Sequence, residues 1–68
     1  MIVNHFSALA GAKRMKISAI RAATGLSRTT LTALYHDRAK GIQFDTLDKL
    51  CQCLQCQPGD LFTLEPKQ

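Results

Sequence analysis

Long apolar runs are absent from this 68-residue sequence, which has no stretch approaching the 18 or more apolar residues that a membrane-spanning helix requires. Its first residues also lack a basic leader followed by a long apolar core, so we expect no signal peptide. Cysteine is scarce and odd in number, with three residues that cannot all pair within one chain. Such usage suits a reducing compartment, and we expect a cytoplasmic protein that does not engage a membrane.

The usual inventory of an active site is missing as well. The sequence has no paired carboxylates in an apolar setting and no glycine-rich phosphate loop, and its two histidines, His5 and His36, fall on different predicted helices. A chain of this length makes one domain, residues 1–68, and leaves no room for a cleft between two lobes. We therefore expect no enzyme, no cofactor and no small-molecule site.

The cysteines form the pattern Cys-x-Cys-x-x-Cys at Cys51, Cys53 and Cys56, which raises the question of a metal site. On a helix, Cys51 and Cys53 point about 200° apart, so they cannot share one ion, and no histidine lies nearby. A structural zinc site needs four ligands. We expect reduced, metal-free thiols, with Cys51 on the apolar side of its helix and Cys53 on the far side.

Acidic residues are rare in the first two thirds of the chain. Residues 1–44 contain one acid, Asp37, against seven basic residues, a net charge of +6, whereas residues 45–68 carry −2. The seven basic residues are Lys13, Arg14, Lys16, Arg21, Arg28, Arg38 and Lys40. This asymmetry indicates a nucleic acid or another anionic surface as partner, the alternative being a solvated face.

Glycine and proline are few, and the gaps between them have the length of helices. Asn4 is expected to cap a first helix that ends near Ala12, and Gly25 to stop a second helix over residues 17–24. Ser27 is expected to cap a third helix over residues 28–36.

The rest of the chain is predicted in the same way. Residues 37–44 are predicted to be a loop, and Asp45 is expected to open a fourth helix in a capping box with Asp48. Residues 58–62 predict one further helical turn that begins with Pro58. The fold class is therefore all-α, with a possible two-stranded ribbon formed by the apolar runs at residues 2–3 and 61–64.

The third helix has two different faces. At 100° per residue, five residues fall within about 140° of one another, and Leu31 and Leu34 lie on the opposite side. The five are Arg28, Thr29, Thr32, Ala33 and His36. Arginine can bind the O6 and N7 atoms of guanine, threonine can hydrogen-bond a base or contact the thymine methyl group, and alanine permits close approach. This face therefore indicates a surface that reads DNA.

Residues 15–18, 24–35, 44–51 and 58–61 together resemble the Cro/cI repressor-like, or XRE-type, helix-turn-helix regulators of bacteria and phages, specifically their minimal single-domain branch. The resemblance extends over residues 2–66. It implies a compact five-helix domain in which residues 17–36 form the DNA-binding helix pair. The positions that touch phosphates or base edges in this family are occupied here by Ser27, Arg28, Thr29, Thr32 and Ala33.

The sequence departs from the family at two positions. Relatives often have Gln where this chain has Ile17, and Ala where it has Arg21. Ile17 cannot make the phosphate hydrogen bond of a glutamine. We expect Arg21 to reach outward to solvent or to shift the helix crossing, with Ala22 as the small residue beside it.

Phosphate contacts are expected from the basic residues that flank the third helix. Lys16, Arg38 and Lys40 fall in the segments next to it, where backbone contacts are made in this docking mode, and we favour phosphate binding over a role in solubility. For Lys13 and Arg14 both interpretations remain open.

These features predict a nucleoid-associated transcriptional regulator of the bacterial cytoplasm that inserts residues 28–36 into the major groove of double-stranded DNA.

We expect a homodimer, at least on DNA, because one helix reads too few base pairs to select a site. Leu61, Phe62 and Leu64 are its candidate contact surface, the alternative being that they fold back on Ile2 and Val3 within one chain. The alternative is an antitoxin-like or adaptor module that uses the same fold to bind a protein.

Overall fold

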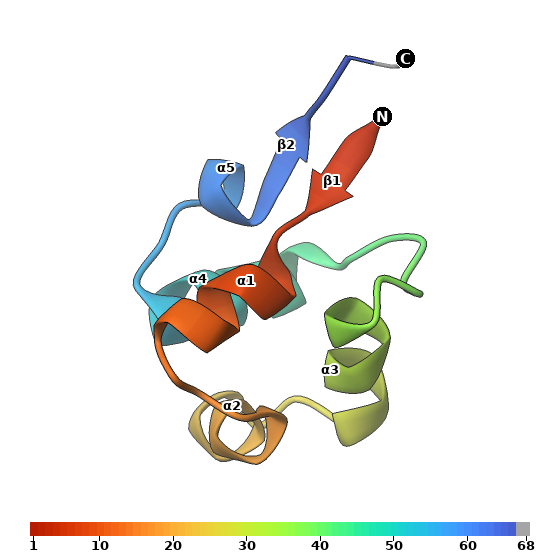
Figure 1. The fold of residues 1–68 in the computed structure, drawn as a ribbon. Coiled ribbons are helices and arrows are strands. Elements are labelled where there is room, and N and C mark those ends of the chain that lie inside the picture. Colours follow the sequence, from red (N-terminus) through yellow and green to blue (C-terminus); the bar gives the residue numbers. More distant parts are fainter. Residues whose placement is uncertain (67–68) are drawn as a thin grey trace.

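Five helices and a two-stranded ribbon form the part of the chain that the computed structural model describes, residues 1–66. Lys67, which was counted in the charge above, lies outside the described residues. The elements are β1 (Ile2–Asn4), α1 (Phe6–Ala12), α2 (Ile17–Thr24), α3 (Arg28–Tyr35), α4 (Phe44–Leu54), α5 (Pro58–Leu61) and β2 (Phe62–Leu64). In Figure 1 the ribbon stands at one end of the molecule, α2 lies at the other, and α3 flanks the helical body between them. The predicted five-helix domain with a terminal ribbon is confirmed.

The hydrophobic core draws on all five helices. Its fully or almost fully buried side chains are Phe6, Ala10, Ile20, Leu31, Leu34, Leu50, Leu54 and Leu61. The pairs within α1, α3 and α4 are three or four residues apart, which is the spacing that places side chains on one face of a helix. Burial of these faces fixes the orientation of each helix, including the direction in which α3 presents its polar side. Among residues 1–66, no helix is long and apolar enough to cross a membrane.

Asn4 ties the ribbon to the helices. The strands pair antiparallel, with Ile2 opposite Leu64 and Asn4 opposite Phe62. The Asn4 Oδ1 atom accepts a hydrogen bond from the Phe6 amide at 2.8 Å, and Nδ2 donates to the Leu34 carbonyl at 2.8 Å. The expected capping oxygen of Asn4 is therefore present, although the residue at the cap position itself is His5. One side chain thus connects β1 to the start of α1 and to the end of α3.

Four helices end in a residue with left-handed backbone conformation. Gly25 adopts this conformation after α2, at φ 74°, as expected. The other three ends use residues that carry a side chain: Arg14 (φ 55°), Asp37 (φ 58°) and Gln55 (φ 53°). In each of these three, the next amide reaches back five residues to a helix carbonyl: Met15 to Ala10 at 2.9 Å, Arg38 to Ala33 at 2.8 Å and Cys56 to Cys51 at 3.0 Å. This is the 6→1 hydrogen bond of a Schellman motif, and it reverses the chain sharply.

The start of α4 differs from the prediction. The helix begins at Phe44 with Gln43 at the cap position, so the capping box expected between Asp45 and Asp48 is wrong. The physical reason is a hydrophobic staple: Ile42 and Leu47, at the N′ and N4 positions, both pack against the core and set where the chain enters the helix.

The carboxylate of a capping box is found instead at α5, where Asp60 supplies it. There the side chain of Asp60 accepts a hydrogen bond from the Gln57 amide at 2.9 Å. Asp48 bonds the Gln52 amide group on the surface of α4, at 3.0 Å. The capping box therefore belongs to the short helix that Pro58 opens.

Two further expectations require correction. Leu61 is fully buried, because the single turn of α5 directs it into the core, and Phe62 packs partly buried beside it. Of the three residues expected on a dimer surface, only Leu64 is largely exposed. Cys53, which was expected on the far side of its helix, is half-buried against the core.

Candidate nucleic-acid interface

The turn between α2 and α3 positions the candidate reading helix. The Thr24 hydroxyl donates to the Ile20 carbonyl at 2.7 Å and accepts from the Leu26 amide at 3.2 Å, which braces the turn from within. The Ser27 hydroxyl then accepts from the Thr30 amide at 3.1 Å and starts α3, as predicted. Since Leu31 is fixed in the core, the opposite side of α3 faces outward.

Ser27 has a structural role in this arrangement. Besides accepting from the Thr30 amide, its hydroxyl donates to the Thr30 side-chain oxygen at 2.8 Å. Both contacts hold the hydroxyl against the first turn of α3. The amides of Arg28 and Thr29 lie in the first helical turn, where no preceding helix carbonyl is available to them. These backbone groups are suited to bind an anion beside the exposed Ser27.

A shallow hollow on the outer side of α3 unites most of the predicted reading residues. It is lined by Arg28, Thr29, Thr32, Ala33 and Arg38. Thr32 and Ala33 form its half-buried floor, and the other three side chains are exposed. Arg38 joins the hollow because the left-handed Asp37 turns the chain back, so that the Arg38 amide bonds the Ala33 carbonyl.

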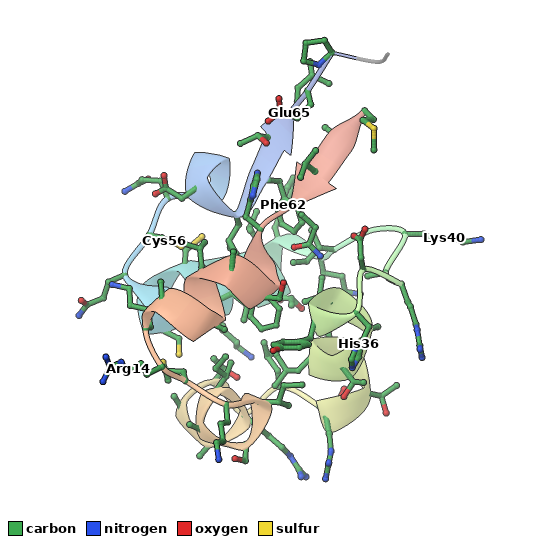
Figure 2. The ribbon with its side chains drawn as sticks, viewed as in Figure 1. Arg14, His36, Lys40, Cys56, Phe62 and Glu65 are labelled. Atoms are coloured by element: carbon green, nitrogen blue, oxygen red, sulfur yellow. The ribbon has the colours of Figure 1, made fainter. Side chains whose placement is uncertain are left out.

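A second hollow adjoins the first, between α3 and the start of α4. Lys40 lines it together with Thr29 and Ala33, and two residues that the sequence analysis missed, Gln43 and Thr46, close its other side. Figure 2 shows the Lys40 side chain extending from the loop away from the body of the protein. Gln43 and Thr46 carried no signal in the sequence, because their position depends on where α4 begins.

A third hollow lies along α2. Lys16 and Arg28 both line it, with Arg14, Arg21 and Tyr35. Arg21 is exposed, so it extends to solvent as one of the two expected alternatives. Ile17, the other departure from the family pattern, packs partly buried against the core.

His36 is not gathered with the other candidates. It follows the last residue of α3 and is exposed, and its ring meets the edge of the Tyr35 ring at a centroid distance of 5.3 Å. Tyr35 is 40% exposed and packs edge to face against Phe6, with the ring centroids 6.4 Å apart. In Figure 2 the His36 side chain lies in front of α3.

The charge of the three hollows is uniformly positive. Their charged side chains are Arg14, Lys16, Arg21, Arg28, Arg38 and Lys40. Asp37, the one acid among residues 1–44, is exposed and lines none of them. Within residues 1–66, no three His, Cys, Asp or Glu side chains come together as metal ligands. The arrangement is a shallow, open, cationic surface with short polar side chains at its centre, which fits an extended polyanion.

Comparison with known proteins agrees with this geometry. Residues 5–67 match the family of the Cro/C1-type HTH DNA-binding domain. The chain is also similar to a protein of Bacillus subtilis (strain 168) described as the uncharacterized HTH-type transcriptional regulator YozG. The two are 28% identical over 60 residues, which cover 88% of this chain and 71% of the relative.

Proposed function

The chain belongs to the family of Cro/C1-type HTH DNA-binding domains, and on that premise we propose that it is a transcriptional regulator that recognises specific sequences in double-stranded DNA through α3 in the major groove. The observation that carries the proposal is the hollow on α3. It combines an exposed arginine at the first turn with two small side chains, Thr32 and Ala33, at its floor.

The chemistry of this hollow suits base edges. Arg28 reads a guanine through two parallel hydrogen bonds, and Thr29 and Thr32 hydrogen-bond a base or contact a thymine methyl group. Ala33 allows the helix to approach closely. Ser27 supports them by capping the helix, and His36, at the far end of α3, takes a peripheral place beside the groove.

Phosphate contacts come from the two flanks of α3. Lys16 lies before α2, and Arg38 and Lys40 lie in the loop after α3, so these cations contact the backbone on either side of the groove. Gln43 adds a polar group beside Lys40. These contacts supply affinity that does not depend on sequence and that falls as salt is added.

The working form is a homodimer on DNA. A single α3 meets only a few base pairs, each worth about 1–3 kcal/mol of discrimination, which is too little to select one site in a genome. Two copies place their α3 helices in successive major grooves, about 34 Å apart, on a nearly palindromic operator.

Selection of bound duplexes from a random pool tests the proposal. We expect enrichment of one motif, and binding of the selected duplex that weakens steeply between low and moderate salt. A variant with Arg28→Ala and Thr32→Ala, both outward positions, serves as the matched control and should not enrich that motif. Recovery of an unenriched pool together with a salt slope near zero would overturn the proposal and favour the protein-binding alternative.

A further inference from the structure

The end of α4 brings two of the three cysteines together. Gln55 adopts the left-handed conformation (φ 53°, ψ 50°), and the Cys56 amide then donates to the Cys51 carbonyl at 3.0 Å. In a Schellman motif the residues at these two positions commonly touch through their side chains. The pKa of the Cys56 thiol is raised, first by burial and then by the neighbouring Cys51 thiol.

Both thiols are reachable from solvent. Cys51 and Cys56 are half-buried, and they line a shallow hollow between α4 and α5 with Leu47 and Pro58. Figure 2 shows Cys56 at the turn that leads from α4 to α5. Cys53 is half-buried against the core like the other two, but it does not line this hollow. The hollow therefore presents two neighbouring thiols to a small oxidant.

We propose that Cys51 and Cys56 are a redox modification site, at which a peroxide converts the two thiols into an intramolecular disulfide that clamps the end of α4 to the segment entering α5. One thiolate attacks a peroxide oxygen and the O–O bond breaks, which yields a sulfenic acid and, after protonation, water. The second sulfur then attacks the sulfenic sulfur, the S–O bond breaks, and the hydroxyl leaves with the second thiol proton as water. Two thiols and one hydrogen peroxide thus give one disulfide and two waters.

The backbone geometry favours this pair over Cys51 and Cys53. A disulfide needs Cα atoms roughly 4.4–6.8 Å apart and side chains that face each other. The backbone hydrogen bond already holds Cys51 beside Cys56, whereas Cys51 and Cys53 diverge by about 200° on the helix. The clamp therefore forms with little movement of the fold.

The reaction should be faster at mildly alkaline pH. Burial raises the pKa of the Cys56 thiol, and the nearby Cys51 and Asp60 raise it further, while Lys13 partly offsets them. Because the thiolate is the nucleophile, less of the reactive form is present at neutral pH.

Three variants of the full chain, each with two cysteines, test the proposal: Cys53→Ala, Cys51→Ala and Cys56→Ala. Each is treated with hydrogen peroxide at low protein concentration, and free thiols and intact mass are followed. We expect only Cys53→Ala to lose both thiols and two hydrogen atoms as a monomer. Cys51→Ala and Cys56→Ala should keep their thiols longer or form dimers and sulfinic acids.

Circular dichroism confirms that each variant is folded before oxidation. If a variant is unfolded, fragment mass spectrometry of the oxidised unsubstituted protein decides, since a link between Cys51 and Cys56 supports the proposal. A link that involves Cys53, or retention of both thiols in Cys53→Ala under conditions that oxidise the other variants, overturns it.

Discussion

Arg28 is the residue at which base reading and phosphate binding can be separated. It is exposed in the first turn of α3 and lines the hollow that holds Thr29 and Thr32. We expect Arg28→Ala to leave folding unchanged and to cost about 1–3 kcal/mol of discrimination at one base pair, most simply a G·C pair. Arg28→Lys keeps the charge but loses the planar fork, so it should restore affinity more than discrimination.

The measurement compares dissociation constants for the selected operator and for each of its single base-pair variants. An equal loss on all sequences for Arg28→Ala, recovered fully by Arg28→Lys, would assign Arg28 to a phosphate.

Lys40 provides a second test at the scale of a residue, because it carries charge without sequence information. Each phosphate that is neutralised contributes about −0.9 to the slope of log K against log salt, so Lys40→Ala should flatten the slope by about one unit on any duplex. Lys49→Ala is the matched control, since Lys49 is equally exposed but lies on α4 outside the three hollows. Equal changes in slope for both variants would show a general effect of net charge, contrary to the assignment.

At the scale of the element, the end of α4 carries backbone strain that a substitution can relieve. Gln55 occupies the left-handed region, which disfavours residues with a Cβ atom by roughly 1–2 kcal/mol relative to glycine. We therefore expect Gln55→Gly to raise the free energy of unfolding by about 1 kcal/mol, less the chain entropy that glycine adds. Gln52→Gly, inside α4, should lower it by a similar amount.

Chemical denaturation of the two variants and the unsubstituted protein measures both values. Destabilisation by Gln55→Gly would contradict this prediction. It would mean that the Gln55 side chain contributes more to the free energy of unfolding than its left-handed backbone costs.

At the scale of the whole molecule, the basic hollows and the exposed apolar residues of the ribbon lie in different regions of the surface. The basic hollows lie around α2 and α3, whereas Ile2 and Leu64, which pair across the ribbon, expose 63% and 76% of their surface at the end opposite α2. Two copies that meet at the ribbon keep their cationic faces apart and bury this apolar pair. We expect Leu64→Gln to weaken cooperative binding to a palindromic operator while leaving the stability of the protomer unchanged.

Mass measurement of the complex with the selected operator should give two protomers per site. Phe44→Gln is the control, because Phe44 is 87% exposed on a different part of the surface, at the start of α4. One protomer on a site without two-fold symmetry would contradict the dimer. Loss of cooperativity in Phe44→Gln instead of Leu64→Gln would place the contact on α4.

Only part of the candidate site could be predicted from the sequence. The outward positions of Arg28 and Thr32 follow from helical periodicity, and the inward position of Leu31 follows from the same count. The recruitment of Arg38 to the hollow depends on the conformation of Asp37, and that of Gln43 on the staple formed by Ile42 and Leu47. These are contacts between elements, which no local pattern encodes.

The sequence by itself determined the parts of this protein that arise within a single element. Period and capping chemistry sufficed for the helices around Ser27 and for the stop at Gly25, since glycine is the residue that marks a left-handed turn at no steric cost. The tertiary structure decided the rest. Arg14, Asp37 and Gln55 adopt the same backbone conformation as Gly25 without being glycine, because the packing of the flanking helices offsets the local strain. Through those three turns the fold decided which charges line the hollows around α3 and which two cysteines lie side by side.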